Sequence, residues 1–128
     1  MLVKIIKKGI SDSIQNAGEY GHQHIGMQAG GYMDFLSAQL ANKIIGNELN
    51  NPLFEIHFPA SHFEFEEDGF IAITGANFVP IINEQSIPMH EIVAIKKGDQ
   101  LQFLQPIQGR IAYIAMTSKV PKKSNIHN

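Results

Sequence analysis

The sequence LFEIHFPASHFEFEEDGFIAIT, residues 53–74, carries the clearest secondary-structure signal in the chain. In 53–58 and again in 62–66, phenylalanine and isoleucine alternate with glutamate and histidine. A period of two places successive side chains on opposite faces of an extended chain, so both segments are predicted to be half-buried β-strands. Glu67-Asp68-Gly69 predicts a turn, and the almost entirely apolar Phe70–Thr74 predicts a strand that is buried on both faces.

Short segments of the same kind recur on both sides of this stretch. Further strands are predicted at Leu2–Ile6, Ile92–Ile95, Leu101–Leu104 and Ile111–Met116, with turns at Asn83-Glu84-Gln85 and Lys97-Gly98-Asp99-Gln100. About eight short strands predict an all-β fold, and a closed or nearly closed β-barrel is expected because closure removes unpaired strand edges.

One amphipathic helix is predicted near residues 32–45. Apolar side chains recur there at spacings of three and four, on one stripe made of Met33, Leu36, Leu40, Ala41 and Ile44. Asp34 fits the first turn, where a carboxylate meets the positive end of the helix dipole. Gly46 stands where a helix end favours a left-handed residue.

Composition places the chain among single-domain proteins. It has 128 residues, of which 44% are hydrophobic, and its formal net charge is -2, so a basic face for nucleic acid is not expected. There is no cysteine, which excludes disulfides and thiolate chemistry. The apolar N-terminus is interrupted by Lys4 and Lys7, so no signal peptide, membrane span or membrane partner is expected, and a cytoplasmic location is predicted.

Two groups of polar residues could serve as ligands or catalysts. His22 and His24, one residue apart, would point to the same side of an extended chain and are weak candidates for a metal site, the alternative being two polar loop histidines. Glu64 and Glu66 alternate with aromatic residues, which favours a solvated face over acid–base catalysis.

Arg110 is the only arginine in the chain. A guanidinium binds a carboxylate or phosphate through two parallel hydrogen bonds, so Arg110 is a candidate anion-binding residue. It could equally be a surface charge or a partner for Glu55. The Thr74-Gly75-Ala76-Asn77 turn is a second candidate, because small residues at a strand end can expose backbone N–H groups.

An ordered series of motifs resembles the KipA family, that of the PxpC subunit of 5-oxoprolinase, also called allophanate hydrolase subunit 2 or the carboxyltransferase domain, subdomains A and B. The resemblance covers about residues 1–116. It rests on Ile14-Gln15-Asn16-Ala17-Gly18, Tyr20-Gly21, Gly30-Gly31-Tyr32-Met33-Asp34, Ala41-Asn42, Leu53-Phe54-Glu55-Ile56, Thr74-Gly75-Ala76 and Gly109-Arg110-Ile111-Ala112-Tyr113.

The resemblance implies a cyclophilin-like barrel over residues 1–116. It also implies a KipI-like (PxpB) partner subunit, a possible LamB/YcsF-like (PxpA) subunit, and a small amide or lactam substrate. ATP would be used by the complex, biotin only in the urea carboxylase relatives, and no cofactor is expected on this chain. Residues 117–128 would form a flexible tail or the start of a second barrel, because the family's proteins are about twice as long.

The sequence departs from the family pattern at Asn16 and Glu19, where an acidic residue and an arginine are usual. The first hypothesis, which follows from the resemblance, is a subunit, or half a subunit, of a 5-oxoprolinase-type amidohydrolase or carboxyltransferase. Its substrate-binding candidates are Arg110, Asn42, Gln15, Thr74, Gly75, Ala76 and Asn77, with no catalytic base identified. The alternative, which the changes at Asn16 and Glu19 and the short length favour, is a non-catalytic KipA-like module that binds and regulates a KipI-like protein. A barrel that serves homo-oligomerisation is the third.

Overall fold

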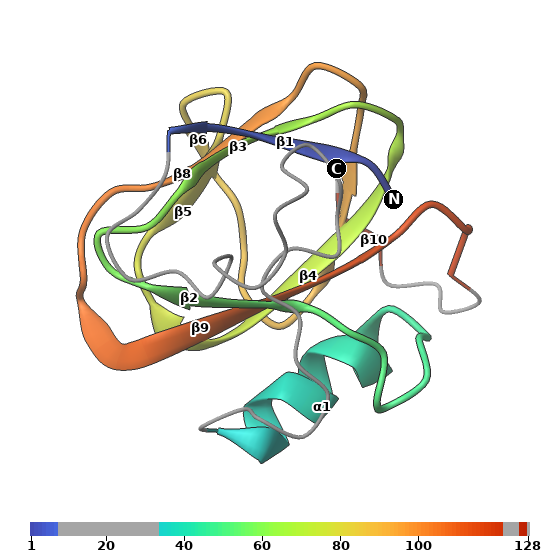
Figure 1. Ribbon diagram of the computed structural model, residues 1–128, viewed down its shortest axis with the longest axis horizontal. Helices are drawn as coiled ribbons and strands as arrows, with labels where there is room; N and C mark the ends of the chain where they lie inside the picture. Colours follow the sequence, from blue (N-terminus) through green and yellow to red (C-terminus); the bar gives the residue numbers. More distant parts are fainter. Residues whose placement is uncertain (8–33, 122–125, 128) are drawn as a thin grey trace.

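The computed structural model describes residues 1–7, 34–121 and 126–127, and it is mainly β (Figure 1). Its elements are β1 (Val3–Lys7), α1 (Phe35–Ile44), β2 (Phe54–His57), β3 (His62–Phe65), β4 (Gly69–Asn77), β5 (Pro80–Ile82), β6 (Gln85–Ser86), β7 (Ile92–Ile95), β8 (Gln100–Phe103), β9 (Gln108–Thr117) and β10 (Ile126–His127). The prediction of a mainly β fold with one helix is confirmed for this part of the chain.

The strands form two five-stranded sheets, ordered β1-β3-β8-β5-β6 and β10-β7-β4-β9-β2. All neighbours are antiparallel except β10 and β7. The expected closed barrel is not found among the described strands, because no hydrogen-bonded pair joins one sheet to the other. β2 and β3 follow each other in sequence but lie in different sheets. The two sheets are held together by the packing of side chains between them. β10 lies within the expected tail.

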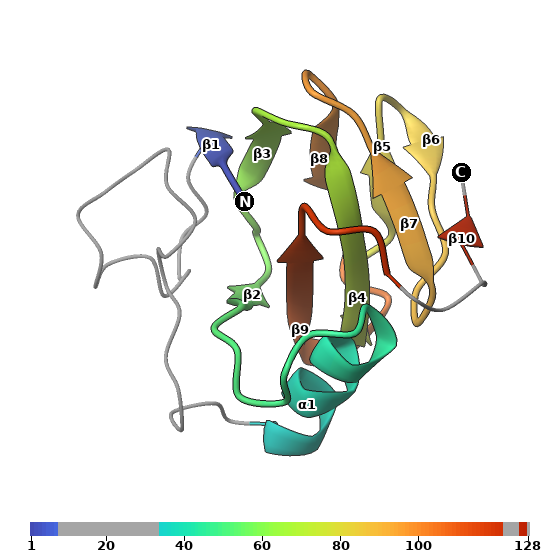
Figure 2. The same cartoon turned by 90° about the vertical axis from the view of Figure 1, so that its right-hand side faces the viewer.

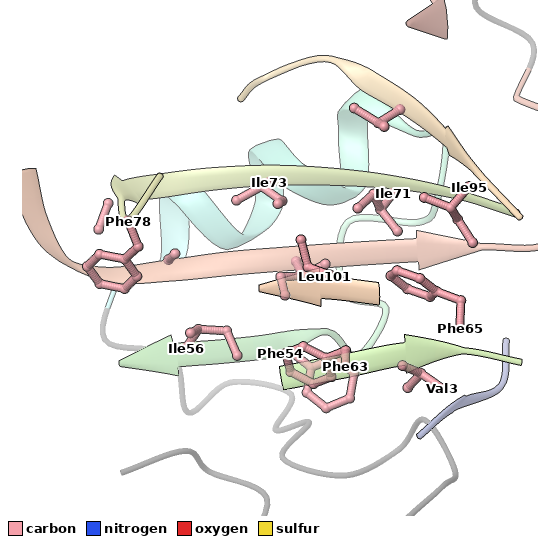
Figure 3. Close-up of a cluster of buried hydrophobic side chains, with 14 residues drawn as sticks. Val3, Phe54, Ile56, Phe63, Phe65, Ile71, Ile73, Phe78, Ile95 and Leu101 are labelled. Carbon is pink, nitrogen blue, oxygen red and sulfur yellow. The ribbon is translucent and has the colours of Figure 1, made fainter. Parts of the chain in front are cut away.

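The main core lies between the two sheets. Figure 3 shows buried side chains from both, with Phe54 and Phe63 close together near its centre. Their ring centroids are 5.2 Å apart and the ring planes are tilted by 57°, an arrangement that aromatic pairs prefer. These residues sit on the apolar positions of the period-two pattern, which explains why that pattern predicted the strands correctly.

Helix α1 covers the opposite face of β4 and β9 (Figure 2). Its buried residues are Ala38, Ala41 and Asn42. The two alanines, with Ile45 just after the helix, pack with residues of β4 and β9. The predicted stripe is confirmed at Ala41, which is buried, and is wrong at its two leucines, since Leu36 is 76% and Leu40 is 41% exposed. Small side chains face the sheet and let the helix approach it closely, so the larger leucines lie outside. Met33 lies outside the described residues.

Three predicted chain reversals are confirmed by the backbone. Asn83 and Glu84 both have a positive φ, 50° and 70°, between the paired residues Ile82 and Gln85, as a tight hairpin requires. Gly98 has a φ of 94° in the turn before β8. Gly46 follows the helix with a φ of 81°, the left-handed conformation expected at a helix end.

Candidate functional site

A register shift between β4 and β9 sets the shape of the candidate site. Gly75 pairs with Ala112 and Asn77 pairs with Gln108, so one residue of β4, Ala76, lies opposite three residues of β9. This stretch of β9, residues 109–111, therefore has two residues more than β4 and bulges out of the ladder with β4, while Ile111 still pairs with His57 of β2. Such bulges redirect side chains near functional sites, and here the bulge carries Arg110.

Two glycines make this arrangement possible. Gly75 and Gly109 have φ values of 86° and 85°, in the left-handed region that other residues rarely adopt. A Cβ atom at Gly109 would lie 2.8 Å from the Cα of Ala76, and one at Gly75 would lie 2.5 Å from the carbonyl oxygen of Ile111. Both positions therefore need glycine, for close approach as well as for backbone conformation.

Beside the bulge lies an open groove of about 560 Å³. It is bordered by the start of α1, the end of β4 and the start of β9, through Asp34, Ser37, Gly75, Ala76, Gln108, Gly109, Arg110 and Ile111. Three of the predicted site residues, Gly75, Ala76 and Arg110, are thus brought together. The sequence analysis missed Ser37 and Gln108, which carry no motif, and had given Asp34 only a helix-end role.

Arg110 supplies the positive charge of the groove. Its side chain is exposed, and among the described residues it makes no hydrogen bond or ion pair. The suggested pair with Glu55 is not formed: Glu55 accepts a 2.7 Å hydrogen bond from the hydroxyl of Tyr113 and lies 3.9 Å from Nε2 of His57. The guanidinium can therefore bind an anion without first giving up a partner within this part of the chain.

Asp34 supplies a negative charge at the helix end of the same groove. Its two carboxylate oxygens accept hydrogen bonds from the hydroxyl and the backbone N–H of Ser37, at 2.6 and 3.1 Å. These bonds lower the pKa of Asp34 below its ordinary value of 3.8, the hydroxyl contributing most. The residue is therefore ionised at neutral pH and caps the first turn of α1.

Two buried hydroxyl groups attach this helix end to the sheet. Thr74 donates a 2.6 Å hydrogen bond to the carbonyl oxygen of Ser37, and the hydroxyl of Tyr113 accepts one of 2.8 Å from the N–H of Asp34. Burial, and secondarily the hydrogen bond to Glu55, raises the pKa of Tyr113. Thr74 was predicted as a binding residue, but here it holds the wall of the groove in place.

Asn42 and Asn77 are placed outside this groove. Asn42 is buried, and its side-chain amide donates to the carbonyl oxygens of Leu49 and Asn51, at 3.2 and 2.8 Å. It therefore fixes the loop after α1. Asn77 accepts a 2.9 Å hydrogen bond from the N–H of Val79 and borders a neighbouring hollow of about 480 Å³.

The remaining candidates, Gln15, His22 and His24, lie outside the described residues. Within residues 1–7 and 34–121, no three histidine, aspartate or glutamate side chains gather as metal ligands would. In the same part of the chain, no helix is long and apolar enough to cross a membrane.

Comparison with known proteins identifies the family. Residues 25–124 match the family described as "Carboxyltransferase domain, subdomain A and B". The chain belongs to this family. The match confirms the predicted resemblance, and it includes both strands and the helix end that form the groove.

Carboxyltransferase-domain relatives extend well beyond this chain. It is 29% identical to one subunit of Escherichia coli 5-oxoprolinase over 93% of its own length and 38% of that protein. It is 33% identical to Saccharomyces cerevisiae urea amidolyase over 94% of its length and 7% of that protein. The chain thus spans well under half of either relative.

Solved structures agree with this assignment. The crystal structure of TTHA0988 matches with a TM-score of 0.74 and 26% identity, over 90% of this chain and 24% of that one. The Kluyveromyces lactis urea amidolyase structure matches with a TM-score of 0.74 and 28% identity, over 90% of this chain and 7% of that one. The fold is therefore shared with part of both solved structures.

Proposed function

We propose that the chain supplies part of the substrate site in a 5-oxoprolinase- or urea-amidolyase-type complex. The complex would act on a small amide or lactam and hydrolyse ATP, in the cytoplasm. The names of the relatives support this assignment, since one is a component of 5-oxoprolinase and another a urea amidolyase. A KipI-like (PxpB) protein and a LamB/YcsF-like (PxpA) protein are the proposed partner subunits. Biotin would take part only in a urea carboxylase-type complex, and no cofactor is proposed for this chain.

The observation that carries the proposal is the placement of Arg110. The bulge in β9 directs it to a groove whose far wall holds an ionised carboxylate, that of Asp34, and no ion pair joins the two among the described residues. A substrate with a carboxylate and an amide N–H offers complementary groups to both. Arg110 would bind the carboxylate, and the lone pairs that Asp34 keeps after binding Ser37 would accept the N–H.

The test is ATP-dependent release of glutamate from 5-oxoproline, measured with the partner subunits present. Arg110→Ala should raise the KM for 5-oxoproline by at least about tenfold, because a charge-assisted hydrogen-bond pair is lost. Lys119→Ala removes another exposed positive charge and serves as the control. An Arg110→Ala complex with the wild-type KM and kcat would remove the assigned role.

A non-catalytic regulatory module is the second candidate, and the outer face of α1 favours it. Phe35, Leu36 and Leu40 are 46, 76 and 41% exposed there, which suits contact with another protein. Titration against a KipI-like protein without substrate tests this function. Tight binding that Leu36→Gln weakens, together with no turnover in the assembled complex, would favour regulation over catalysis.

A further inference from the structure

The groove at Arg110 adjoins the second hollow, which is the space of about 480 Å³ beside Asn77. Gly75 and Gln108 border both spaces. The second hollow is formed by the end of β4, the hairpin of β5 and β6 and the chain that follows it, through Asn77, Val79, Pro80, Ser86, Ile87, Met89, His90 and Ile107 as well. Gly75 borders both spaces with backbone atoms alone, because it has no side chain.

The two spaces differ in chemistry. Arg110 and Asp34 give the groove its charges, whereas Val79, Ile87, Met89 and Ile107 line the hollow with apolar groups. Ile107 keeps 59% of its surface exposed, which is costly for a large apolar side chain. A ligand that covered it would gain binding energy from the removal of that surface from water.

The hollow also has polar side chains, those of Asn77, Ser86, His90 and Gln108. The side-chain oxygen of Asn77 accepts the N–H of Val79, so the amide nitrogen points elsewhere and can donate to a ligand. His90 has a φ of 63°, a conformation that non-glycine residues adopt at an energetic cost, and its N–H donates a 2.8 Å hydrogen bond to the carbonyl oxygen of Ile73. This bond holds the 86–90 segment against β4.

We propose that the groove and the hollow together bind one ligand, a carboxylate with an aliphatic body. Its carboxylate lies at Arg110, and its apolar part crosses Gly75 to contact Met89 and Ile107. Volumes of about 560 and 480 Å³ are each of the size that small-molecule sites have. The inference rests on the anion-binding role of Arg110 proposed above and adds an apolar requirement on the same ligand.

The experiment is an NMR titration of the full chain with acetate, butyrate and hexanoate at one ionic strength. Each methylene group that leaves water strengthens binding by up to about fourfold, so hexanoate should bind at least about tenfold more tightly than acetate. The backbone N–H signals of Met89 and Gly109 should shift together. Met89→Gln should reduce this preference to less than about threefold and leave acetate binding unchanged.

Leu40→Gln makes the same kind of change on the exposed face of α1 and should retain the full preference. Equal affinities for the three acids, with binding abolished by Arg110→Gln, would overturn the shared-ligand inference and leave the anion site intact. Hexanoate binding that Arg110→Gln does not weaken would overturn the anion site and the shared ligand together. A chain-length preference that Met89→Gln does not change would also overturn the inference, because the apolar part would then bind elsewhere.

Discussion

The hydroxyl of Thr74 donates a 2.6 Å hydrogen bond to the carbonyl oxygen of Ser37, across the contact between β4 and α1. Thr74 is fully buried, and Ser37 lines the groove that contains Arg110. The bond therefore ties the wall of the groove to the strand that forms its floor. Tyr113 makes an equivalent connection from β9 to Asp34, so both strands of the site hold the same helix end.

Replacing Thr74 with valine keeps the side-chain shape and removes the hydroxyl. We expect the free energy of unfolding to fall by about 1–2 kcal/mol, because a buried hydrogen bond is lost. Thr117→Val serves as the control, since the hydroxyl of Thr117 accepts only an exposed bond from the N–H of Lys119. Urea denaturation measures both, and equal losses would contradict the role assigned to Thr74.

Tyr113 should make the fold sensitive to alkaline pH. Its pKa is raised in the folded state, chiefly by burial, from an ordinary value of 10.0. The neutral phenol therefore stabilises the fold fully below pH 10, and this contribution is lost as the pH rises above it. Urea midpoints measured from pH 8 to pH 11 should fall less steeply in Tyr113→Phe than in the wild type. Tyr20 and Tyr32 are present in both proteins, so parallel curves would exclude Tyr113 as the source.

Asp34 should make the fold sensitive to acidic pH. Its pKa is lowered by the two hydrogen bonds from Ser37, so its stabilising contribution is present above the ordinary value of 3.8 and is lost as the pH falls through the lowered pKa. Asp34→Asn keeps a good helix-capping residue without a titrating group. Thermal unfolding between pH 5 and pH 2 should show a smaller loss for Asp34→Asn. A loss as large as in the wild type would refute the assignment.

The bulge offers a matched pair of glycine substitutions. Gly109 and Gly98 both have a positive φ, but a Cβ at Gly109 would lie 2.8 Å from Ala76, whereas one at Gly98 meets nothing within 4 Å. Gly98→Ala should cost about 1–2 kcal/mol, the backbone penalty alone. Gly109→Ala should cost at least about 1 kcal/mol more, since overpacking is added. Similar losses in urea denaturation would show that the close contact with Ala76 relaxes without cost.

The period-two sequence pattern predicted β2 and β3 well because each of these two strands has one face in the core. Phe54, Ile56, Phe63 and Phe65 all point inward, as their alternation indicated. The hairpin at Asn83 and the helix end at Gly46 followed from local turn chemistry. Such features depend on neighbours in sequence, which a single chain reveals.

The helix face and the groove depended on long-range contacts. Leu36 and Leu40 are the larger apolar residues of the predicted stripe, yet the sheet packs against the small Ala41 of that stripe and against Ala38, which the prediction left out. The register shift that presents Arg110 arises from pairing between β4 and β9, which the sequence pattern did not reveal. The capping position of Asp34 does not show which strands lie beside that helix end. The sequence alone could therefore not assign Asp34 to the site that β4 and β9 form with it.

The central claim is that Arg110 binds the carboxylate of a small amide or lactam in this groove. Titration of the ¹⁵N-labelled chain with 5-oxoproline, followed at the N–H signals of Ala76 and Gly109, tests it directly. The account predicts saturable shifts in the wild type and an affinity about 10–100-fold weaker in Arg110→Gln, the loss of a charge-assisted hydrogen-bond pair. Equal dissociation constants for the two proteins, or shifts confined to residues away from the groove, would contradict it.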